Sequence, residues 1–220
     1  LKADLLACHW SALYTVISMQ KGKVPENTLL QDCHSLEPTG FSPMIILSEY
    51  ELIYNNKDDF YAISPKSEQM AACPECSHSL KYRDSRLRIR KVHGGGSDQL
   101  LIRRLKCSHC KRLHTELPDV LAPYKHYTTE VIEDVVVDSD DLETEADPCE
   151  ATMHRWNPWL FYNQLRIDGL LKSVGYRLLG FSEVFLKSGL SLLAGIRETG
   201  AGWLGTILRV IYNAGNFLPA

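Results

Sequence analysis

Two CxxC cysteine pairs flank a strand–turn–strand pattern, a connector with two prolines comes next, and apolar residues at helical spacing fill the rest of the chain. These observations predict an α+β fold: a zinc-ribbon β-hairpin domain followed by an all-α helix-turn-helix and a helical C-terminal region. We expect five segments: an N-terminal extension (residues 1–43), short strands with a linker (44–72), the zinc ribbon (73–117), the connector with the helix-turn-helix (118–164) and the helical C-terminal region (165–220).

The N-terminal extension has weak apolar periodicity and begins with leucine. Two interpretations are open. In one, Met44 is the natural start, and the earlier residues come from upstream translation or belong to something longer. In the other, residues 5–19 form an N-terminal helix with a loose connection. Met44 precedes Ile-Ile-Leu-Ser, which predicts the start of a strand.

The two cysteine pairs are the strongest signal in the chain. They read Cys-Pro-Glu-Cys and Cys-Ser-His-Cys, with thirty residues between them. Zn²⁺ takes four thiolates in a tetrahedron, at Zn–S distances of about 2.3 Å, and a tight turn with two cysteines three positions apart supplies two of its corners. Four thiolates leave no open coordination position. We therefore expect a structural Zn²⁺ on Cys73, Cys76, Cys107 and Cys110.

Other uses of these cysteines fit less well. A redox pair needs a βαβ context and no second CxxC, and a disulfide framework suits a small secreted chain rather than seven cysteines in 220 residues. Cys8, Cys33 and Cys149 are expected to be free thiols. Three histidines lie near the pairs and could each replace a cysteine as ligand: His78, His109 and His114. Reduced cysteines without an export signal predict a cytoplasmic protein.

Charge is distributed unevenly around the predicted hairpin. Residues 81–126 hold twelve Lys or Arg and four acids, a formal charge of +8, whereas residues 127–154 hold ten acids and no Lys or Arg. Within residues 81–92 the arginines alternate with apolar residues, as in a half-buried strand, and Gly94–Gly96 predict the turn. The pattern favours a polyanion-binding surface over a merely solvated one. The residues expected to contact DNA phosphates are Arg86, Arg88, Arg90, Lys91, Arg103, Arg104 and Lys125.

Helix signals begin after the connector, residues 117–127. Thr128 or Thr129 can cap a helix that carries valines and an isoleucine at helical spacing. An acidic loop follows, and Asp147 with Pro148 predicts the N-cap and first turn of a second helix. Pro158 then requires either a kink or a new helix start.

Beyond residue 159, apolar residues recur at helical spacing, and glycines separate two or three groups of them. A small packed helical bundle is the simpler interpretation, and a groove for a partner is the alternative. Charged residues interrupt this region, so its uncharged runs are shorter than the ~20 residues that a membrane-spanning helix needs.

Three strings carry a resemblance to a known family. They are the connector L-P-D-V-L-A-P-Y-K-H-Y after the second cysteine pair, T-M-H-R-W at residues 152–156, and Y-N-A-G-N-F-L-P at residues 212–219. Residues 44–218 resemble an uncharacterised bacterial family with a zinc ribbon and a helix-turn-helix. That arrangement is similar to the N-terminal DNA-binding region of insertion-sequence transposases. The resemblance implies a DNA-binding protein linked to a mobile element or phage, and it implies no catalytic residues.

Function follows from these features as a choice between classes. In a helix-turn-helix the early residues of the second helix meet base edges, which points here to Thr152, His154 and Arg155. Trp156 and Trp159 are expected to fill the core beneath that helix. Double-stranded DNA is therefore the expected partner, with a transposase or another protein as a further one and neither a membrane nor a small-molecule substrate. A non-catalytic protein-interaction adaptor is the alternative. An enzyme is not expected, because no strand-rich segment follows residue 127 to hold catalytic metal ions.

Overall fold

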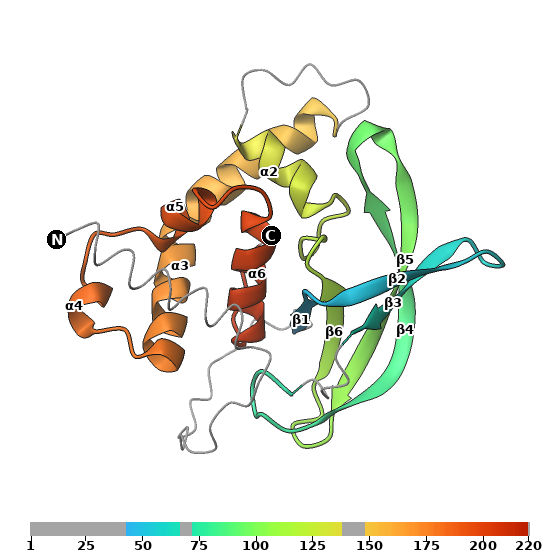
Figure 1. The fold of residues 1–220 in the computed structure, drawn as a ribbon, viewed down its shortest axis with the longest axis horizontal. Helices are drawn as coiled ribbons and strands as arrows, with labels where there is room; N and C mark the ends of the chain where they lie inside the picture. The colour runs from blue at the N-terminus through green and yellow to red at the C-terminus, as the bar shows by residue number, and fades with distance from the viewer. Residues whose placement is uncertain (1–42, 67–71, 138–147, 220) are drawn as a thin grey trace.

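A computed structural model describes residues 43–66, 72–137 and 148–219. Within these ranges a curled mixed sheet is followed by helices that pack beside it (Figure 1). The elements are β1 (Met44–Leu47), β2 (Tyr50–Asn55), β3 (Phe60–Pro65), β4 (Leu80–Lys91), the 3₁₀ turn η1 (His93–Gly95), β5 (Ser97–Cys107), β6 (Leu113–Pro118), α2 (Thr129–Val137), α3 (Glu150–Leu179), α4 (Glu183–Leu186), α5 (Leu192–Arg197) and α6 (Trp203–Asn213).

Strand β5 organises the sheet. It pairs with β4 along almost its whole length in an antiparallel hairpin, from Leu80 opposite Cys107 to Lys91 opposite Ser97. Its other edge pairs first with β3, in parallel, and then with β6, antiparallel. The β2–β3 hairpin and β1, which runs parallel to β6, complete the six strands.

The predicted arrangement of a separate zinc-ribbon domain followed by an all-α region is therefore wrong, although the α+β class is consistent with the structure. The hairpin between the cysteine pairs is part of a sheet that also contains strands from before and after it. The physical reason is visible on β5, where Leu100 and Ile102 are fully buried and need cover from β3 and the helices. Such pairing between distant segments leaves no local signal in the sequence.

The predicted helix-turn-helix is also not found. Its two helices would be joined by a turn of about 3–4 residues, but twelve residues separate the end of α2 from the start of α3. Helix α3 runs from Glu150 to Leu179 with Pro158 inside it, so the alternative in which a new helix starts at that proline is wrong. The helix predicted after Thr128 is confirmed as α2, with the Thr128 hydroxyl 3.4 Å from the amide of Val131. Cys149 takes the N-cap position of α3, and Asp147 lies outside the described residues.

Helix α6 joins the two parts of the molecule. It packs between α3 and the β1 side of the sheet (Figure 1), with Leu204, Ile207 and Ile211 fully buried. The side-chain amide of Asn213 accepts from the amide of Ile46, at 2.7 Å, and donates to its carbonyl, at 2.9 Å. These bonds satisfy backbone groups at the outer edge of β1 that have no strand beside them.

Two further contacts fix the helices that border the site described below. The buried carboxylate of Glu133 on α2 accepts from the amides of Gly202 and Leu204, at 2.8 and 2.7 Å, and so caps α6. The indole of Trp159 on α3 donates to the carbonyl of Pro219, at 2.7 Å, which holds the C-terminal segment against α3. Across the described parts of the chain, every helix is too short or too polar to cross a membrane.

Candidate metal centre and basic groove

The four predicted cysteines meet at one end of the β4–β5 hairpin. Their sulfur atoms all lie within 4.8 Å of one another. The Sγ atoms of Cys73 and Cys110 are 3.7 Å apart, and those of Cys76 and Cys107 are 3.4 Å apart. A tetrahedron with Zn–S distances of about 2.3 Å has edges of about 3.8 Å. The cysteine set therefore fits a four-coordinate metal ion.

The two cysteine pairs form matching turns. In each, the amide of the first cysteine donates to the carbonyl five residues later, at 2.9 Å. The residue after the second cysteine, Ser77 in one turn and Lys111 in the other, has a positive φ of 58° or 63°. This backbone brings amide N–H groups toward the sulfur atoms, which favours thiolates over thiols.

Proton affinities differ sharply between the sulfurs. Burial raises the pKa of the Cys73 thiol to about 12. Burial also raises the pKa of Cys107, but hydrogen bonds from the amides of His109 and Cys110 and from neighbouring thiols outweigh it and bring the pKa to about 6. A metal ion binds thiolates, so its binding to these cysteines would release their protons.

A buried histidine contacts one of the cysteines. His114 on β6 is fully buried, and its Nε2 lies 3.3 Å from the sulfur of Cys73. Burial lowers the pKa of His114, so the ring is neutral near pH 7 and can donate from Nε2 to a thiolate. His78 and His109 are exposed and stack on each other at 4.0 Å. Cys149 is exposed at the start of α3, and Cys8 and Cys33 lie outside the described residues.

Three of the hairpin arginines form ion pairs within the sheet. Arg90 pairs with Asp98 directly across the hairpin. Arg104 pairs with Asp84 at 2.5 Å, and Arg103 on β5 pairs at 2.6 Å with the buried Glu116 of β6. These carboxylates pair with three of the five hairpin arginines that were expected to contact phosphates. Of the expected phosphate contacts on the hairpin, Arg86 is exposed.

Arg88 has a different partner. One nitrogen of its guanidinium donates to two carbonyls of the connector, those of Ala122 at 3.0 Å and Lys125 at 2.6 Å. Burial lowers its pKa to about 10, which still leaves it charged at neutral pH. The backbone of Lys91 adds two more bonds to the connector, through His126 and Thr128. The hairpin thus holds the connector segment 122–128 in place.

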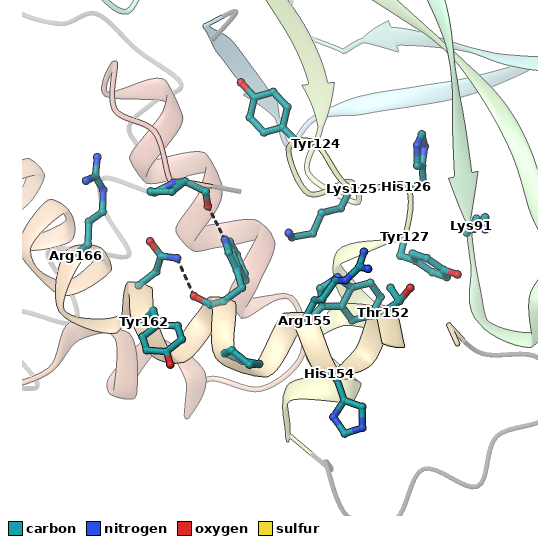
Figure 2. A pocket seen from close by; sticks show the side chains of 15 residues that line it. Lys91, Tyr124, Lys125, His126, Tyr127, Thr152, His154, Arg155, Tyr162 and Arg166 are labelled. Atoms are coloured by element: carbon teal, nitrogen blue, oxygen red, sulfur yellow. Dashed lines mark hydrogen bonds between the residues drawn. The ribbon is translucent and has the colours of Figure 1, made fainter. Parts of the chain in front are cut away.

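A groove opens between this connector and the first half of α3 (Figure 2). Its volume is about 1020 Å³. The structure brings five of the predicted DNA-contacting residues to this one place, and leaves the other five on the hairpin. The five in the groove are Lys91, Lys125, Thr152, His154 and Arg155. The imidazole of His154 is largely exposed and lies 3.2 Å from Glu150.

The groove is basic and aromatic. Among the described residues that line it are Lys91, Lys125, Arg155 and Arg166, and none of the lining residues is Asp or Glu. None of these four cations forms an ion pair with a described carboxylate; three of them lie over aromatic rings instead. Lys125 Nζ is 4.5 Å from the ring centre of Trp159, and burial lowers the pKa of Lys125. The ring of Tyr127 lies beneath Lys91 and packs edge-on against the buried Trp156.

The sequence did not single out several groove residues. Tyr124 and Tyr127 belong to the connector, and Tyr162 and Arg166 belong to α3. The connector string P-Y-K-H-Y is dense in cations and rings, and that density was the available signal. Of the two tryptophans expected in the core, Trp156 is buried there, whereas Trp159 is half-buried and lines the groove.

Comparison with known proteins gives one match. Residues 73–156 match a family model described as a domain of unknown function (DUF6431). The matched stretch begins at the first metal-site cysteine and ends at Trp156, so it contains all four cysteines, the connector and the start of α3. No curated protein and no solved structure matches the chain.

Proposed function

We propose that this protein binds DNA in the groove between the connector and α3, and that a structural Zn²⁺ on the four cysteines stabilises the sheet that positions the connector. The observation that carries the proposal is the state of the groove's charges. Lys91, Lys125, Arg155 and Arg166 face one cavity without a described carboxylate partner, while Arg90, Arg103 and Arg104 of the hairpin are paired with carboxylates. Cations that are not neutralised by a carboxylate are available to an external polyanion.

The electrostatics favour a phosphate backbone as that polyanion. Each phosphate neutralised by Lys or Arg releases condensed counterions, and this release supplies most of the affinity of sequence-independent binding. With four cations in the groove, the logarithm of the affinity for duplex DNA is expected to fall with the logarithm of salt concentration with a slope of up to about −3.6.

The metal has a structural part in this proposal. Zinc on four thiolates would hold the start of β4, the end of β5 and the turn before β6 together, and it would leave no position for a substrate. The resemblance of the connector and of T-M-H-R-W to the DNA-binding region of insertion-sequence transposases supports DNA as the polyanion. It also supports a role in a mobile element, alone or beside a transposase.

The test uses the zinc-loaded full chain and labelled duplex DNA. Fluorescence anisotropy at several salt concentrations gives the affinity and its salt slope. We expect the pair Lys125→Gln and Arg155→Gln to weaken binding and to reduce the slope by about 1.8, because two phosphate contacts are lost. The matched control is Lys81→Gln with Lys106→Gln, two exposed lysines that face each other on the hairpin outside the groove.

The control removes the same charge, so a general effect of net charge would lower both slopes equally. That result would contradict the proposal, as would a failure of the unaltered protein to bind DNA at low salt. Sequencing of duplexes retained from a random pool shows in addition whether one sequence is preferred.

A second candidate, the protein-interaction adaptor, has one observation in its favour. Phe161 and Leu165 are adjacent on α3 and are 67% and 88% exposed. An apolar pair at i and i+4 on one helix face suits a protein partner. The adaptor predicts a complex that tolerates salt and that is lost on Phe161→Ser with Leu165→Ser, a change that should leave DNA binding unaltered.

A further inference from the structure

The groove is concave, and this shape bears on whether it binds a double or a single strand of nucleic acid. A recognition helix reads a duplex by projecting into the major groove, which is about 12 Å wide. Here the first half of α3 is one wall of a hollow, the connector is the opposite wall, and the Arg155 side chain reaches into the space between them (Figure 2). A double helix would meet the rims of this hollow, whereas one strand fits between its walls.

Aromatic rings in the walls supply a second argument. Tyr124 on the connector is 41% exposed and Tyr162 on α3 is 79% exposed, although both are large rings. The faces of paired bases in a duplex are covered by their neighbours, so a protein ring can stack only on an unpaired base. Proteins that bind single strands combine such rings with cations that follow the backbone, which is the composition of this groove.

The backbone at Tyr124 strengthens the argument. Its φ is 62°, in the left-handed region that bulky residues rarely adopt. Conformations of this kind persist where surrounding contacts enforce them, and they gather at ligand-binding positions. The enforcing contact is Arg88, which binds the carbonyls on both sides of Tyr124, at Ala122 and Lys125. The loop that displays Tyr124 and Lys125 is thereby fixed before any ligand arrives.

We propose that the groove takes an unpaired strand of DNA, with phosphates on Lys125, Arg155 and Arg166 and bases stacked on Tyr124 and Tyr162. This inference rests on the proposed DNA-binding function and adds the form of DNA that the groove prefers. Arg88 acts in it as a positioning residue: it does not face the strand and instead holds the connector.

The test compares one labelled strand of about twelve nucleotides, long enough to cross a single binding groove, with the same strand in a duplex. Fluorescence anisotropy with the zinc-loaded full chain gives both affinities. We expect the single strand to bind at least about tenfold more tightly than the duplex. Tyr124→Leu and Tyr162→Leu should each weaken single-strand binding about five- to hundredfold, while Tyr124→Phe and Tyr162→Phe keep it.

Two controls separate stacking from damage to the fold. Tyr176→Leu changes an exposed tyrosine on the same helix outside the groove and should bind like the unaltered protein. Thermal unfolding identifies any variant that is no longer folded, and the Phe variants test the ring in a side chain of nearly unchanged shape. Lys125→Gln should lower the salt slope for the single strand by about 0.7, whereas the Tyr variants should leave that slope unchanged.

The outcomes distinguish this inference from the proposal beneath it. Tighter single-strand binding that depends on both rings supports the inference. Binding to the duplex that is equal or tighter, and that is indifferent to the Leu variants, overturns the inference and leaves DNA binding by the groove standing. Failure of both forms of DNA to bind overturns the two together.

Discussion

Removal of the metal should loosen one end of the sheet and leave the rest of the fold in place. The reason is that the buried apolar residues form two clusters. A small one holds Ile45, Leu80 and Leu105 with Cys73 and Cys107, and a much larger one joins the helices to the remainder of the sheet. The four cysteines that could hold the metal belong to the small cluster or pack against it, and that cluster has only five buried residues among those described.

The size of the effect follows from mass action. With free zinc at about a thousand times its dissociation constant, binding stabilises the folded site by about 4 kcal/mol. Loss of that stabilisation should speed local hydrogen exchange roughly a thousandfold. The amides concerned include those of Cys73 and Cys107, which donate within the two cysteine turns. Amides of α6 lie in the large cluster and should keep their protection.

The assay is hydrogen–deuterium exchange with mass spectrometry, before and after treatment with a zinc chelator. Peptides covering residues 72–82 and 104–114 report on the metal site, and a peptide covering residues 203–213 is the internal control. Unchanged exchange at both sites would refute a structural metal. Equal loss of protection in all three peptides would refute the division into two clusters, because the metal would then hold the whole fold.

Two further predictions concern single side chains. Glu133→Ala should lower the free energy of unfolding, measured by urea denaturation, by about 1–3 kcal/mol, because it leaves the amides of Gly202 and Leu204 without their acceptor. Glu130→Ala changes an exposed residue on the same helix and should cost less than about 0.5 kcal/mol. Equal costs for the two variants would contradict the capping role of Glu133. Burial lowers the pKa of Lys125, so its charge is lost as pH rises through a value below the usual pKa of lysine, about 10.4. DNA affinity should therefore fall in that pH window, and Lys125→Arg should remove the fall; an unchanged pH profile in that variant would show that another group is responsible.

Local signals in the sequence predicted the cluster of four cysteines and helix α2. The CxxC pairs are short turns whose chemistry depends on four residues each, and α2 begins beside a capping threonine at Thr128. Both features arise within a few residues of chain, which is the range over which spacing and propensity act. The strands of the hairpin were also predicted, from the alternation of residues 81–92. The expected burial is reversed, because Leu87 and Ile89 are 50% and 45% exposed whereas Arg88 and Arg90 are partly buried.

The environment of the arginines could not be predicted in this way. Arg90 and Asp98 are neutralised by each other only because the register of β4 on β5 places them opposite, and Arg103 meets Glu116 because β6 lies beside β5. A shift of one residue in either pairing would have turned these side chains to opposite faces. The formal charge counted along the sequence therefore identified a basic segment, but it did not show which of its cations lack a carboxylate partner.

The groove could not be predicted from the sequence for a related reason. Its walls come from the end of β4, the connector and α3, and Pro219 closes it from the far end of the chain. Periodicity indicated that α3 would be helical, but the direction of its groove face depends on packing against α2, α5 and α6. The long helix also crosses Pro158, where the local pattern left a kink and a new helix start as alternatives.

A single physical chain links the metal site to the groove. The cysteine turns lie where β4 starts and β5 ends. From there β4 pairs with β5 from Leu80 to Lys91, with one irregularity between Tyr82 and Asp84. That register decides where Arg88 and the backbone of Lys91 meet the connector. Because Arg88 holds the loop that carries Tyr124, the form of the groove depends on the register of this hairpin.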